Sequence, residues 1–270
     1  MKKSFGQNVL TDTTFLEKII DVINLTSDDT VIEIGAGSGC LTILLAKQVK
    51  KVFAVEPEMD ILKKLKYNIN QNKLKNVEIV EKSFLKVDLG ELSNKSFKVI
   101  GNIPYNLTSK ILLKLFGEID SPARHLKQLT DVYLMLQCEV AERLIAKPNT
   151  KAYSPLTLLI QYFAEPEILF KTPKEAFFPV PKVESAFVHL KVKSKLQHIE
   201  NPVFLRTVIR SAFQQRRKKI INSLEGLFGD KKNTEEKLNE LNLNYNLRAE
   251  NLSFVDFLKI SDCFKQDLNV

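Results

Sequence analysis

The segment Thr30-Val-Ile-Glu-Ile-Gly-Ala-Gly-Ser-Gly-Cys-Leu41 decides the fold of this 270-residue chain. It joins a short β-branched run to three closely spaced glycines and then to an apolar stretch of helical length, a pattern typical of a strand, a tight loop and a helix. Glycines at such a point let the backbone approach a ligand at the carboxyl end of a strand, beside the amino end of a helix. The segment therefore predicts a ligand-binding loop in a sheet with helical crossovers.

The residues on either side extend this pattern. Strand-like runs at 51–56, 77–84, 97–102 and 131–137 alternate with helical runs at 59–71, 109–119 and 139–146, after an opening amphipathic helix at 11–24. Strands separated by helical crossovers specify a mostly parallel sheet with helices on both faces. Two further strand-like runs, at 157–173 and 185–192, flank the proline-rich stretch 177–183 and predict an antiparallel strand near the sheet edge.

The residues after 193 carry no further strand pattern. One long helix is expected over 202–228, followed by helices over 233–242 and 253–264, where Ser253 and Asp256 have capping-box spacing. We therefore expect an α/β chain with a Rossmann-like, mostly parallel sheet domain over 1–193 and a small all-α domain over 194–270.

The composition excludes several classes of protein. With 44% hydrophobic and 27% charged residues, and no run of signal-peptide or membrane-span length, we expect a globular, cytoplasmic monomer. Cys40, Cys138 and Cys263 are far apart and have no ligand spacing with a histidine, so we expect neither disulfides nor a metal site. The net charge of +8 favours a polyanionic partner, although a solvated lysine-rich surface explains it equally well until the charge is localised.

The spacing of the glycines distinguishes two classes of ligand. The dinucleotide-binding fingerprint GxGxxG requires glycine at position 40, where this chain has Cys40. The three glycines instead form GxGxG, and with Glu33 two residues before the first of them they resemble the first motif of class I S-adenosylmethionine methyltransferases. Glu56, at the end of the second strand, suits an acceptor for ribose hydroxyls in either class, because a carboxylate can accept from both hydroxyls.

Asn102-Ile103-Pro104-Tyr105 follows the fourth strand and therefore lies at the same edge of the sheet as the glycines. A turn with asparagine and proline is common in its own right. The residue types nevertheless suit methyl transfer to an adenine amine, whose lone pair is delocalised into the ring. The Asn102 oxygen and a backbone carbonyl near Pro104 can accept the two protons of that amine, and Tyr105 can stack on the base. No separate general base is evident.

Together with the segment from Phe177 to Ser185, these motifs resemble the KsgA/RsmA family of small-subunit ribosomal RNA adenine N6,N6-dimethyltransferases over nearly the whole chain. Gly6-Gln7-Asn8-Val9-Leu10 also matches this family, in which it helps to close over the cofactor. The resemblance implies that S-adenosylmethionine is bound by Asn8, Leu10, Gly35, Gly37, Glu56, Ser83 and Asn102. It also implies that Asn102, Ile103, Pro104 and Tyr105 act on the target adenine, and that the Phe177 ring faces the flipped base in addition to any structural role at the sheet edge.

Ser83 departs from the pattern of this family. The family usually has aspartate after the third strand, where its carboxylate accepts from the adenine amine of the cofactor, and alignment on the next three residues places Ser83 there. A hydroxyl can still accept, but a charge-assisted hydrogen bond is lost, a difference of about 1 kcal/mol. We therefore expect weaker cofactor binding with retained activity, unless the neighbouring Glu81 takes the place of the aspartate.

Six cations lie within fourteen residues of the long C-terminal helix, with no acid between them. They are Arg206, Arg210, Arg216, Arg217, Lys218 and Lys219. Arg206, Arg210 and Arg217 align by helical spacing, and the others flank them. We interpret this face as a contact for RNA phosphates, the alternative being a solvated surface, and the run around Arg216 also resembles a signature of the family.

The resemblance implies dimethylation of two adjacent adenosines in the 3′-terminal stem-loop of small-subunit ribosomal RNA, on the immature subunit and during its biogenesis. A loop target suits a pocket with aromatic faces, because a base leaves a loop more easily than a duplex. One alternative is an antibiotic-resistance methyltransferase of large-subunit ribosomal RNA, which shares these motifs but matches residues 146–153 less well. The other is a non-catalytic RNA-binding assembly factor, against which the intact Asn102 and Glu56 argue.

Overall fold

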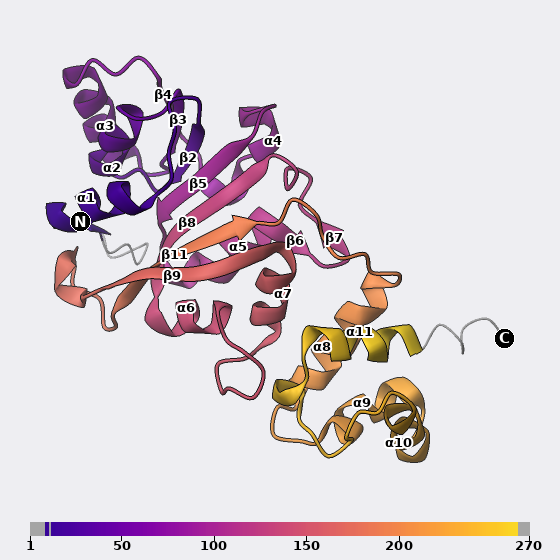
Figure 1. Cartoon of the computed structure of the whole chain (residues 1–270). Coiled ribbons are helices and arrows are strands. Elements are labelled where there is room, and N and C mark those ends of the chain that lie inside the picture. Colours follow the sequence, from indigo (N-terminus) through magenta and orange to yellow (C-terminus); the bar gives the residue numbers. More distant parts are fainter. Residues whose placement is uncertain (1–8, 11, 264–270) are drawn as a thin grey trace. The chain divides into compact units, whose positions relative to one another are not determined.

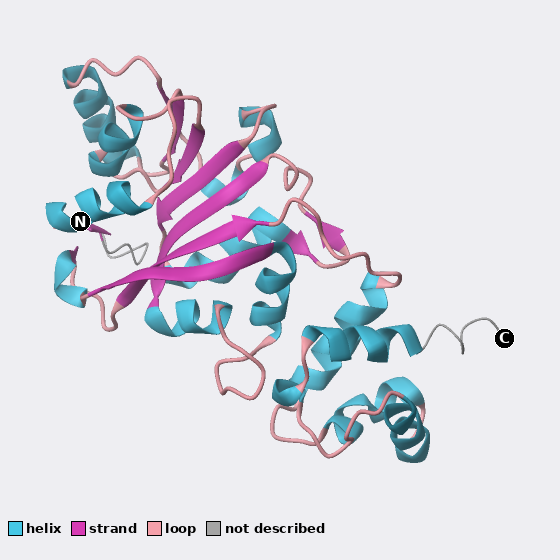
Figure 2. Ribbon diagram, viewed as in Figure 1, coloured by secondary structure: helices cyan, strands magenta, loops and turns pink. Residues whose placement is uncertain are grey.

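Figure 1 presents a computed structural model of the chain, which describes residues 9, 10 and 12–263. Its largest sheet has seven strands in the order β4-β3-β2-β5-β8-β11-β9 (Figure 2). The strands are β2 (Thr30–Ile34), β3 (Lys51–Val55), β4 (Val77–Val80), β5 (Phe97–Asn102), β8 (Leu129–Gln137), β9 (Ala164–Thr172) and β11 (Ser185–Val192). Neighbours from β4 to β8 are parallel, whereas β11 is antiparallel to both β8 and β9. The predicted fold class, a mostly parallel sheet with one antiparallel strand near the edge, is confirmed.

Helices lie before and between the strands of the large sheet, most of them where the alternation predicts. They are α1 (Thr13–Val22), α2 (Cys40–Ala46), α3 (Met59–Gln71), α4 (Leu89–Leu92), α5 (Thr108–Phe116), α6 (Cys138–Leu144) and α7 (Pro155–Phe163). The helix α1 begins after Asp12, whose side chain accepts from Thr14 N at 2.9 Å. Its buried Leu16 and Ile19 share one apolar cluster with Leu45 of α2 and with residues of the sheet, so this helix is held by burial of its apolar face.

Two pairs of very short strands accompany the large sheet. The strand β1 (Val9–Leu10) pairs antiparallel with β10 (Phe177–Phe178), and β6 (Gly117–Glu118) pairs with β7 (Ser121–Pro122). The pair β1–β10 brings the beginning of the described chain next to the proline-rich stretch that precedes β11.

The single strand expected over 157–173 is wrong. The helix α7 covers residues 155–163, and only residues 164–172 form the strand β9. The apolar residues of α7 are almost all buried, and a continuous apolar run has no periodicity that separates a buried helix from a buried strand. The start signal lies at Ser154, whose N–H donates to Thr157 Oγ1 at 3.0 Å while its hydroxyl oxygen accepts from Thr157 N at 3.4 Å.

The single helix expected over 202–228 is also wrong, because it is two helices, α8 (Pro202–Gln214) and α9 (Ile220–Phe228). Residues 215–219, which include four consecutive cations, form the turn between them. The N–H of Ile220 at the start of α9 donates to Leu247 O at 2.6 Å. The break thus uses an acceptor far along the chain, which local periodicity cannot indicate.

The last two helices, α10 (Lys231–Glu240) and α11 (Phe254–Cys263), lie where they are expected. Ser253 and Asp256 form the predicted capping box before α11. Ser253 N donates to Asp256 Oδ2 at 2.9 Å, and Asp256 N donates to Ser253 Oγ at 3.2 Å.

The chain divides into two compact units. The first comprises residues 1–117, 123–141 and 164–194 and contains the seven-stranded sheet. The second comprises residues 118–122, 142–163 and 195–270 and contains α7 together with the four helices from α8 to α11. No helix in the described part of the chain is long and apolar enough to cross a membrane.

Candidate functional site

The glycine loop, residues 35–39, joins β2 to α2 at the carboxyl end of the parallel strands. Gly35 N and Ala36 N both donate to Val55 O, at 2.9 and 3.1 Å, and so tie the loop to the end of β3. Gly39 precedes α2 with a φ of +93°, and a Cβ atom there would lie 2.8 Å from Leu65 Cδ1. The left-handed backbone favours glycine, and an added Cβ atom would also have to displace the end of the Leu65 side chain. The glycines thus expose backbone at this edge.

Glu56 holds the glycine loop from the end of β3. Its side chain is 1% exposed, with Oε2 accepting from Gly37 N at 2.9 Å and Oε1 accepting from Glu58 N at 3.0 Å. Burial raises the pKa of this carboxyl, and the two backbone hydrogen bonds act in the opposite direction. Each carboxylate oxygen has a second lone pair, so Glu56 can also accept from a ligand hydroxyl.

Glu33, the acid before the first glycine, lies deeper than its motif suggests. It is 2% exposed, and burial raises its pKa to about 8, although a hydrogen bond from Thr42 Oγ1 at 2.5 Å partly opposes the shift. At neutral pH the carboxyl is therefore mostly protonated. Thr42, in the first turn of α2, carries no signal in the sequence that identifies it as this partner.

Asn102 ends β5, and the structure brings its motif next to the glycine loop. A Cβ atom on Gly35 would lie 3.5 Å from Asn102 O. Asn102 is half-buried and Ile103 is 2% exposed, so the motif is anchored by the residue that follows the asparagine. Pro104 O accepts from Leu107 N at 2.9 Å. Of its two lone pairs, one thus remains for the role expected of a carbonyl at this position.

Tyr105 makes a hydrogen bond that the sequence does not indicate. Its hydroxyl lies 2.5 Å from Ser185 Oγ at the start of β11. Burial raises the pKa of Tyr105, with the Ser185 hydrogen bond acting in the opposite direction. Ser185 belongs to the proline-rich motif, but only the folded sheet shows that its hydroxyl meets a residue 80 positions earlier.

Phe177 and Leu10 face each other across the β1–β10 pair. Phe177 is 1% exposed and Leu10 is 6% exposed, and both belong to the apolar cluster that includes α1. The structural role expected for Phe177 is thus present, while its contact with a base stays a prediction. The neighbouring Phe178 is 61% exposed. Asn8 lies outside the described residues.

Ser83 lies after β4 as the alignment predicts. It is half-buried and precedes a short 3-10 turn over residues 84–86, with its backbone carbonyl accepting from Lys86 N at 2.8 Å. Glu81, the neighbouring acid, pairs with Lys66 at 2.5 Å on the exposed surface. This ion pair directs the Glu81 carboxylate to α3, so the structure offers no support for Glu81 as the substitute for the missing aspartate.

This arrangement fits S-adenosylmethionine. The buried carboxylate of Glu56 suits the ribose hydroxyls, and the three glycines of the loop beside it leave room for the rest of the molecule. No group of three or more His, Cys, Asp or Glu residues in the described chain could hold a metal ion. The polar groups at this edge therefore suit an organic cofactor with hydroxyl groups.

The six cations predicted to contact RNA do not share one helical face. The alignment of Arg206, Arg210 and Arg217 is wrong, because α8 ends before Arg217. Arg206 and Arg210 lie on α8 and line a shallow cavity of about 560 Å³, and Arg206 is paired with Asp120 at 3.0 Å. The remaining four, at residues 216–219, lie in the turn 215–219.

The four cations of the turn differ in their surroundings. Arg216 donates to backbone carbonyls and to Glu250, and Lys219 Nζ donates to Asn246 Oδ1 at 2.6 Å. Arg217 and Lys218 are exposed, and no side-chain partner is found for them in the described chain. Adjacent residues of one basic run thus have different structural roles.

The chain matches the family model for ribosomal RNA adenine dimethylase over residues 1–266. Ribosomal RNA small subunit methyltransferase A of Francisella tularensis subsp. novicida is 37% identical over 264 residues, covering 97% of this chain and 96% of the relative. The protein of the same name from Acaryochloris marina is 38% identical over 263 residues, with the same coverage.

Solved structures are similar over the same length. A dimethyladenosine transferase from Plasmodium falciparum has a TM-score of 0.78 and 25% identity, and covers 96% of this chain and 98% of that chain. The 23S rRNA methyltransferase ErmE has a TM-score of 0.73 and 22% identity, and covers 96% of this chain and all of that chain, which shows a shared fold.

Proposed function

Because the chain belongs to the ribosomal RNA adenine dimethylase family, we propose that it dimethylates N6 of two adjacent adenosines in the 3′-terminal stem-loop of small-subunit ribosomal RNA. Methyltransferases of this family use S-adenosylmethionine. The small-subunit relatives, 37 and 38% identical over 97% of the chain, support the choice of RNA. The observation that carries the proposal is the meeting of the glycine loop, Glu56 and the Asn102 motif at one edge of the sheet.

The cofactor, when bound, supplies a methyl group on a positively charged sulfur. Glu56 would accept from its ribose hydroxyls, and the backbone of the glycines in the loop 35–39 would lie against it. Because Glu56 already fixes Gly37 and Glu58, the carboxylate is held in place before the ligand arrives. Ser83 would face the cofactor's adenine amine.

The target amine would be oriented by the Asn102 motif. The Asn102 side-chain oxygen and the Pro104 carbonyl accept its two protons, which favours a tetrahedral nitrogen with its lone pair directed at the methyl group. Tyr105, held by Ser185, would stack on one face of the base, and Phe177 would be the second aromatic face against it. Most of the rate enhancement then comes from positioning.

Recognition of the RNA is assigned to the helical residues 194–270 and to shape and phosphate contacts. The exposed Arg217 and Lys218 are suited to phosphates, as are Arg210 and the partly exposed Arg206. We place the reaction in the cytoplasm, on the immature small subunit, with the protein acting as a monomer.

Transfer of labelled methyl groups tests the proposal. The protein is incubated with tritiated S-adenosylmethionine and either immature small or large ribosomal subunits, and primer extension then locates the modified bases. We expect two adjacent modified adenosines near the 3′ end of the small-subunit RNA. Label on the large-subunit RNA would favour the resistance-type enzyme, and no label on either would favour an assembly factor without catalysis.

Asn102→Ala serves as the catalytic control in this assay. Removal of one positioned hydrogen-bonding group from a developing charge costs about 10²–10³-fold in rate. We expect a loss of this size in methyl transfer while RNA binding is retained. Transfer at an undiminished rate would remove Asn102 from the mechanism.

A further inference from the structure

The loop 145–154 joins α6 to α7 and carries two exposed lysines, Lys147 and Lys151. Within it, Thr150 Oγ1 donates to Lys147 O at 2.7 Å and Tyr153 N donates to Thr150 O at 3.1 Å. Asn149 has a φ of +71°, a conformation that asparagine adopts more readily than most residues. A surface loop with local turns alone opens easily, so its order depends on the segments that contact it.

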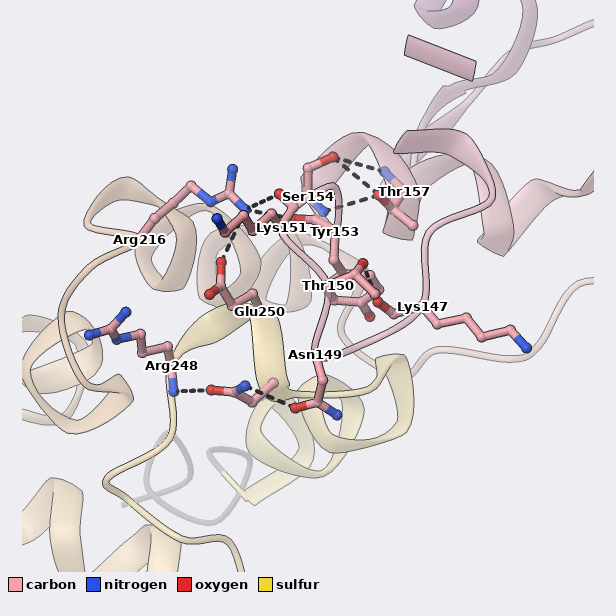
Figure 3. Close-up of polar contacts among 11 residues, drawn as sticks. Lys147, Asn149, Thr150, Lys151, Tyr153, Ser154, Thr157, Arg216, Arg248 and Glu250 are labelled. Carbon is pink, nitrogen blue, oxygen red and sulfur yellow. Dashed lines mark hydrogen bonds and ion pairs between the residues drawn. The ribbon is translucent and has the colours of Figure 1, made fainter. Parts of the chain in front are cut away.

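Arg216 is one of these contacts, and Figure 3 shows its guanidinium directed at the loop and at Glu250. Its Nη2 donates to Lys151 O at 2.9 Å, to Tyr153 O at 3.0 Å and to Glu250 Oε2 at 3.1 Å. One side chain thus joins two carbonyls of the loop to a carboxylate of a different segment. Hydrogen bonds of this kind, with a charged donor, are stronger than neutral ones.

Glu250 lies in a 3-10 turn over Ala249–Asn251 that contacts the same loop. Asn149 N donates to Glu250 O at 2.8 Å, and Asn251 Nδ2 donates to Asn149 Oδ1 at 2.9 Å. The turn therefore holds the middle of the loop, while Arg216 holds its last residues. The Arg216–Glu250 pair connects the two sets of contacts.

The engaged guanidinium of Arg216 differs from its neighbours in the basic run. Its charge is offset by Glu250, and its Nη2 has three acceptors in the folded chain. A phosphate would have to compete with these acceptors. Arg217 and Lys218 are exposed, with no side-chain partner found among residues 12–263, and have no such competition.

We propose that Arg216 is a positioning residue that acts on RNA through the loop 145–154, whose Lys151 contacts phosphate together with Arg217 and Lys218. Arg216 keeps Lys151 in place by holding its carbonyl. This inference rests on the proposed function, because it assigns a role in binding the same RNA. It separates Arg216, an internal contact, from Arg217 and Lys218, two contacts for the substrate.

Trypsin cleavage after Lys151 measures the order of the loop without RNA. Lys147 is followed by Pro148, which protects that bond, so Lys151–Ala152 is the cleavable bond of the loop. Cleavage under native conditions follows the population of the open loop. We expect Arg216→Ala to raise the rate of this cleavage about tenfold, a change of ~1.4 kcal/mol in loop opening. Arg217→Ala, the matched control, should leave the rate unchanged.

The RNA affinity of a Glu250 variant distinguishes a positioning role of Arg216 from direct contact with phosphate, because the two roles predict changes of opposite sign. Glu250→Ala removes a negative charge, so it should tighten RNA binding if Arg216 contacts phosphate directly. If Arg216 positions the loop, the same variant should weaken binding about threefold, because Arg216 loses the carboxylate that fixes its guanidinium beside the loop. The probe is the immature small ribosomal subunit, with affinities measured at one fixed salt concentration.

Substitution by lysine gives a second test, in which each variant keeps the positive charge. Arg217→Lys should bind RNA nearly as well as the unchanged protein, because a lysine still pairs with phosphate. Arg216→Lys should bind about threefold or more weakly, because all three acceptors are reached by Nη2 and the lysine ammonium lies one bond nearer the backbone. It should also raise the cleavage after Lys151, which keeps the test informative even if Arg216→Ala fails to fold.

Two results would overturn the inference. One is tighter RNA binding by Glu250→Ala; the other is unchanged cleavage after Lys151 in both Arg216 variants. Absence of methyl transfer by the unchanged protein would contradict the proposed function instead, and the cleavage experiment would still report whether Arg216 holds the loop.

Discussion

The glycine loop at residues 35–39 and the basic turn at residues 215–219 each lead into a helix, but they are held in opposite ways. In the glycine loop, backbone N–H groups donate to Val55 O and Glu56 Oε2, two acceptors that follow each other in the chain. In the basic turn, the side chain of Arg216 reaches carbonyls 63 and 65 positions away and a carboxylate 34 positions away. The glycine loop makes its contacts with its own backbone N–H groups, whereas the basic turn makes them with a long side chain.

This difference determines what each region tolerates. A glycine with a left-handed φ and a neighbour within contact distance accepts a side chain only at a cost in stability. A side chain that reaches distant carbonyls can be exchanged at little cost to the backbone, but the segment at its far end then loses an anchor. Substitutions should therefore act locally and strongly in the glycine loop, and at a distance in the basic turn.

The largest effect is expected at Glu56, which joins the glycine loop to the cofactor. Glu56→Ala leaves Gly37 N and Glu58 N without their acceptor and removes the carboxylate proposed for the ribose. Hydrogen bonds to a charged group contribute about 1.5–3 kcal/mol each, so we expect at least a hundredfold loss of S-adenosylmethionine affinity, measured by calorimetry. Glu56→Gln keeps one acceptor oxygen, so its affinity should lie between those of the unchanged protein and the alanine variant. Unchanged affinity in the alanine variant would leave Glu56 as a purely structural residue.

Gly39→Ala should destabilise the fold by about 1–2 kcal/mol, because alanine is strained at a left-handed φ, and its Cβ atom would also have to displace the end of the Leu65 side chain, 2.8 Å away. Gly226→Ala is the matched control in α9, where nothing lies within 4 Å of the added atom. In a helix interior the same change is stabilising by up to about 1 kcal/mol. Urea denaturation of the two variants measures the difference. If both are neutral, the glycine loop is not held by its backbone conformation.

The same contrast explains which features the sequence could predict. The glycine loop and the Asn102 motif depend on glycine spacing and on the ends of parallel strands, which are local signals that place both at one edge. The break before α9 depends on Leu247, and the contacts of Arg216 depend on Glu250, so neither is visible in a local pattern. Thr42 and Ser185 were missed for the same reason, since both are partners that only the fold brings close.

The raised pKa of Glu33, beside the glycine loop, predicts that the stability of the fold depends on pH. Its folded pKa of about 8 lies above its ordinary value of 4.5, so between these values the folded state holds a proton that the unfolded state releases. Its contribution to stability is complete below pH 4.5 and is lost as the pH rises to about 8. Glu33→Gln cannot titrate and keeps an acceptor for Thr42. Between pH 5 and 8 we expect the Tm of this variant to gain several degrees relative to the unchanged protein, with about 2–4 °C for each kcal/mol.

A constant Tm difference across that range would show that Glu33 titrates near its ordinary pKa. Asp131 provides an internal comparison at the other end of the strands. Burial alone would raise its pKa, but hydrogen bonds from His189 and Thr130 outweigh burial and lower the pKa. Its contribution to stability is therefore lost toward low pH, the opposite direction to that of Glu33.

The smallest effect is expected at Ser83, where the proposed contact with the cofactor is made by a side chain and not by the backbone. Its hydroxyl makes no capping hydrogen bond to the 3-10 turn that follows, and the nearby Glu81 is paired with Lys66. Ser83→Asp should thus introduce a carboxylate that can accept from the adenine amine of S-adenosylmethionine without disturbing the backbone. A charge-assisted hydrogen bond in place of a neutral one is worth about 1 kcal/mol, or roughly a fivefold gain in affinity by calorimetry. Ser83→Asn is the control without the charge and should give a smaller gain, because its amide oxygen accepts as a neutral group. Equal affinities in all three proteins would mean that the cofactor's adenine amine does not reach residue 83.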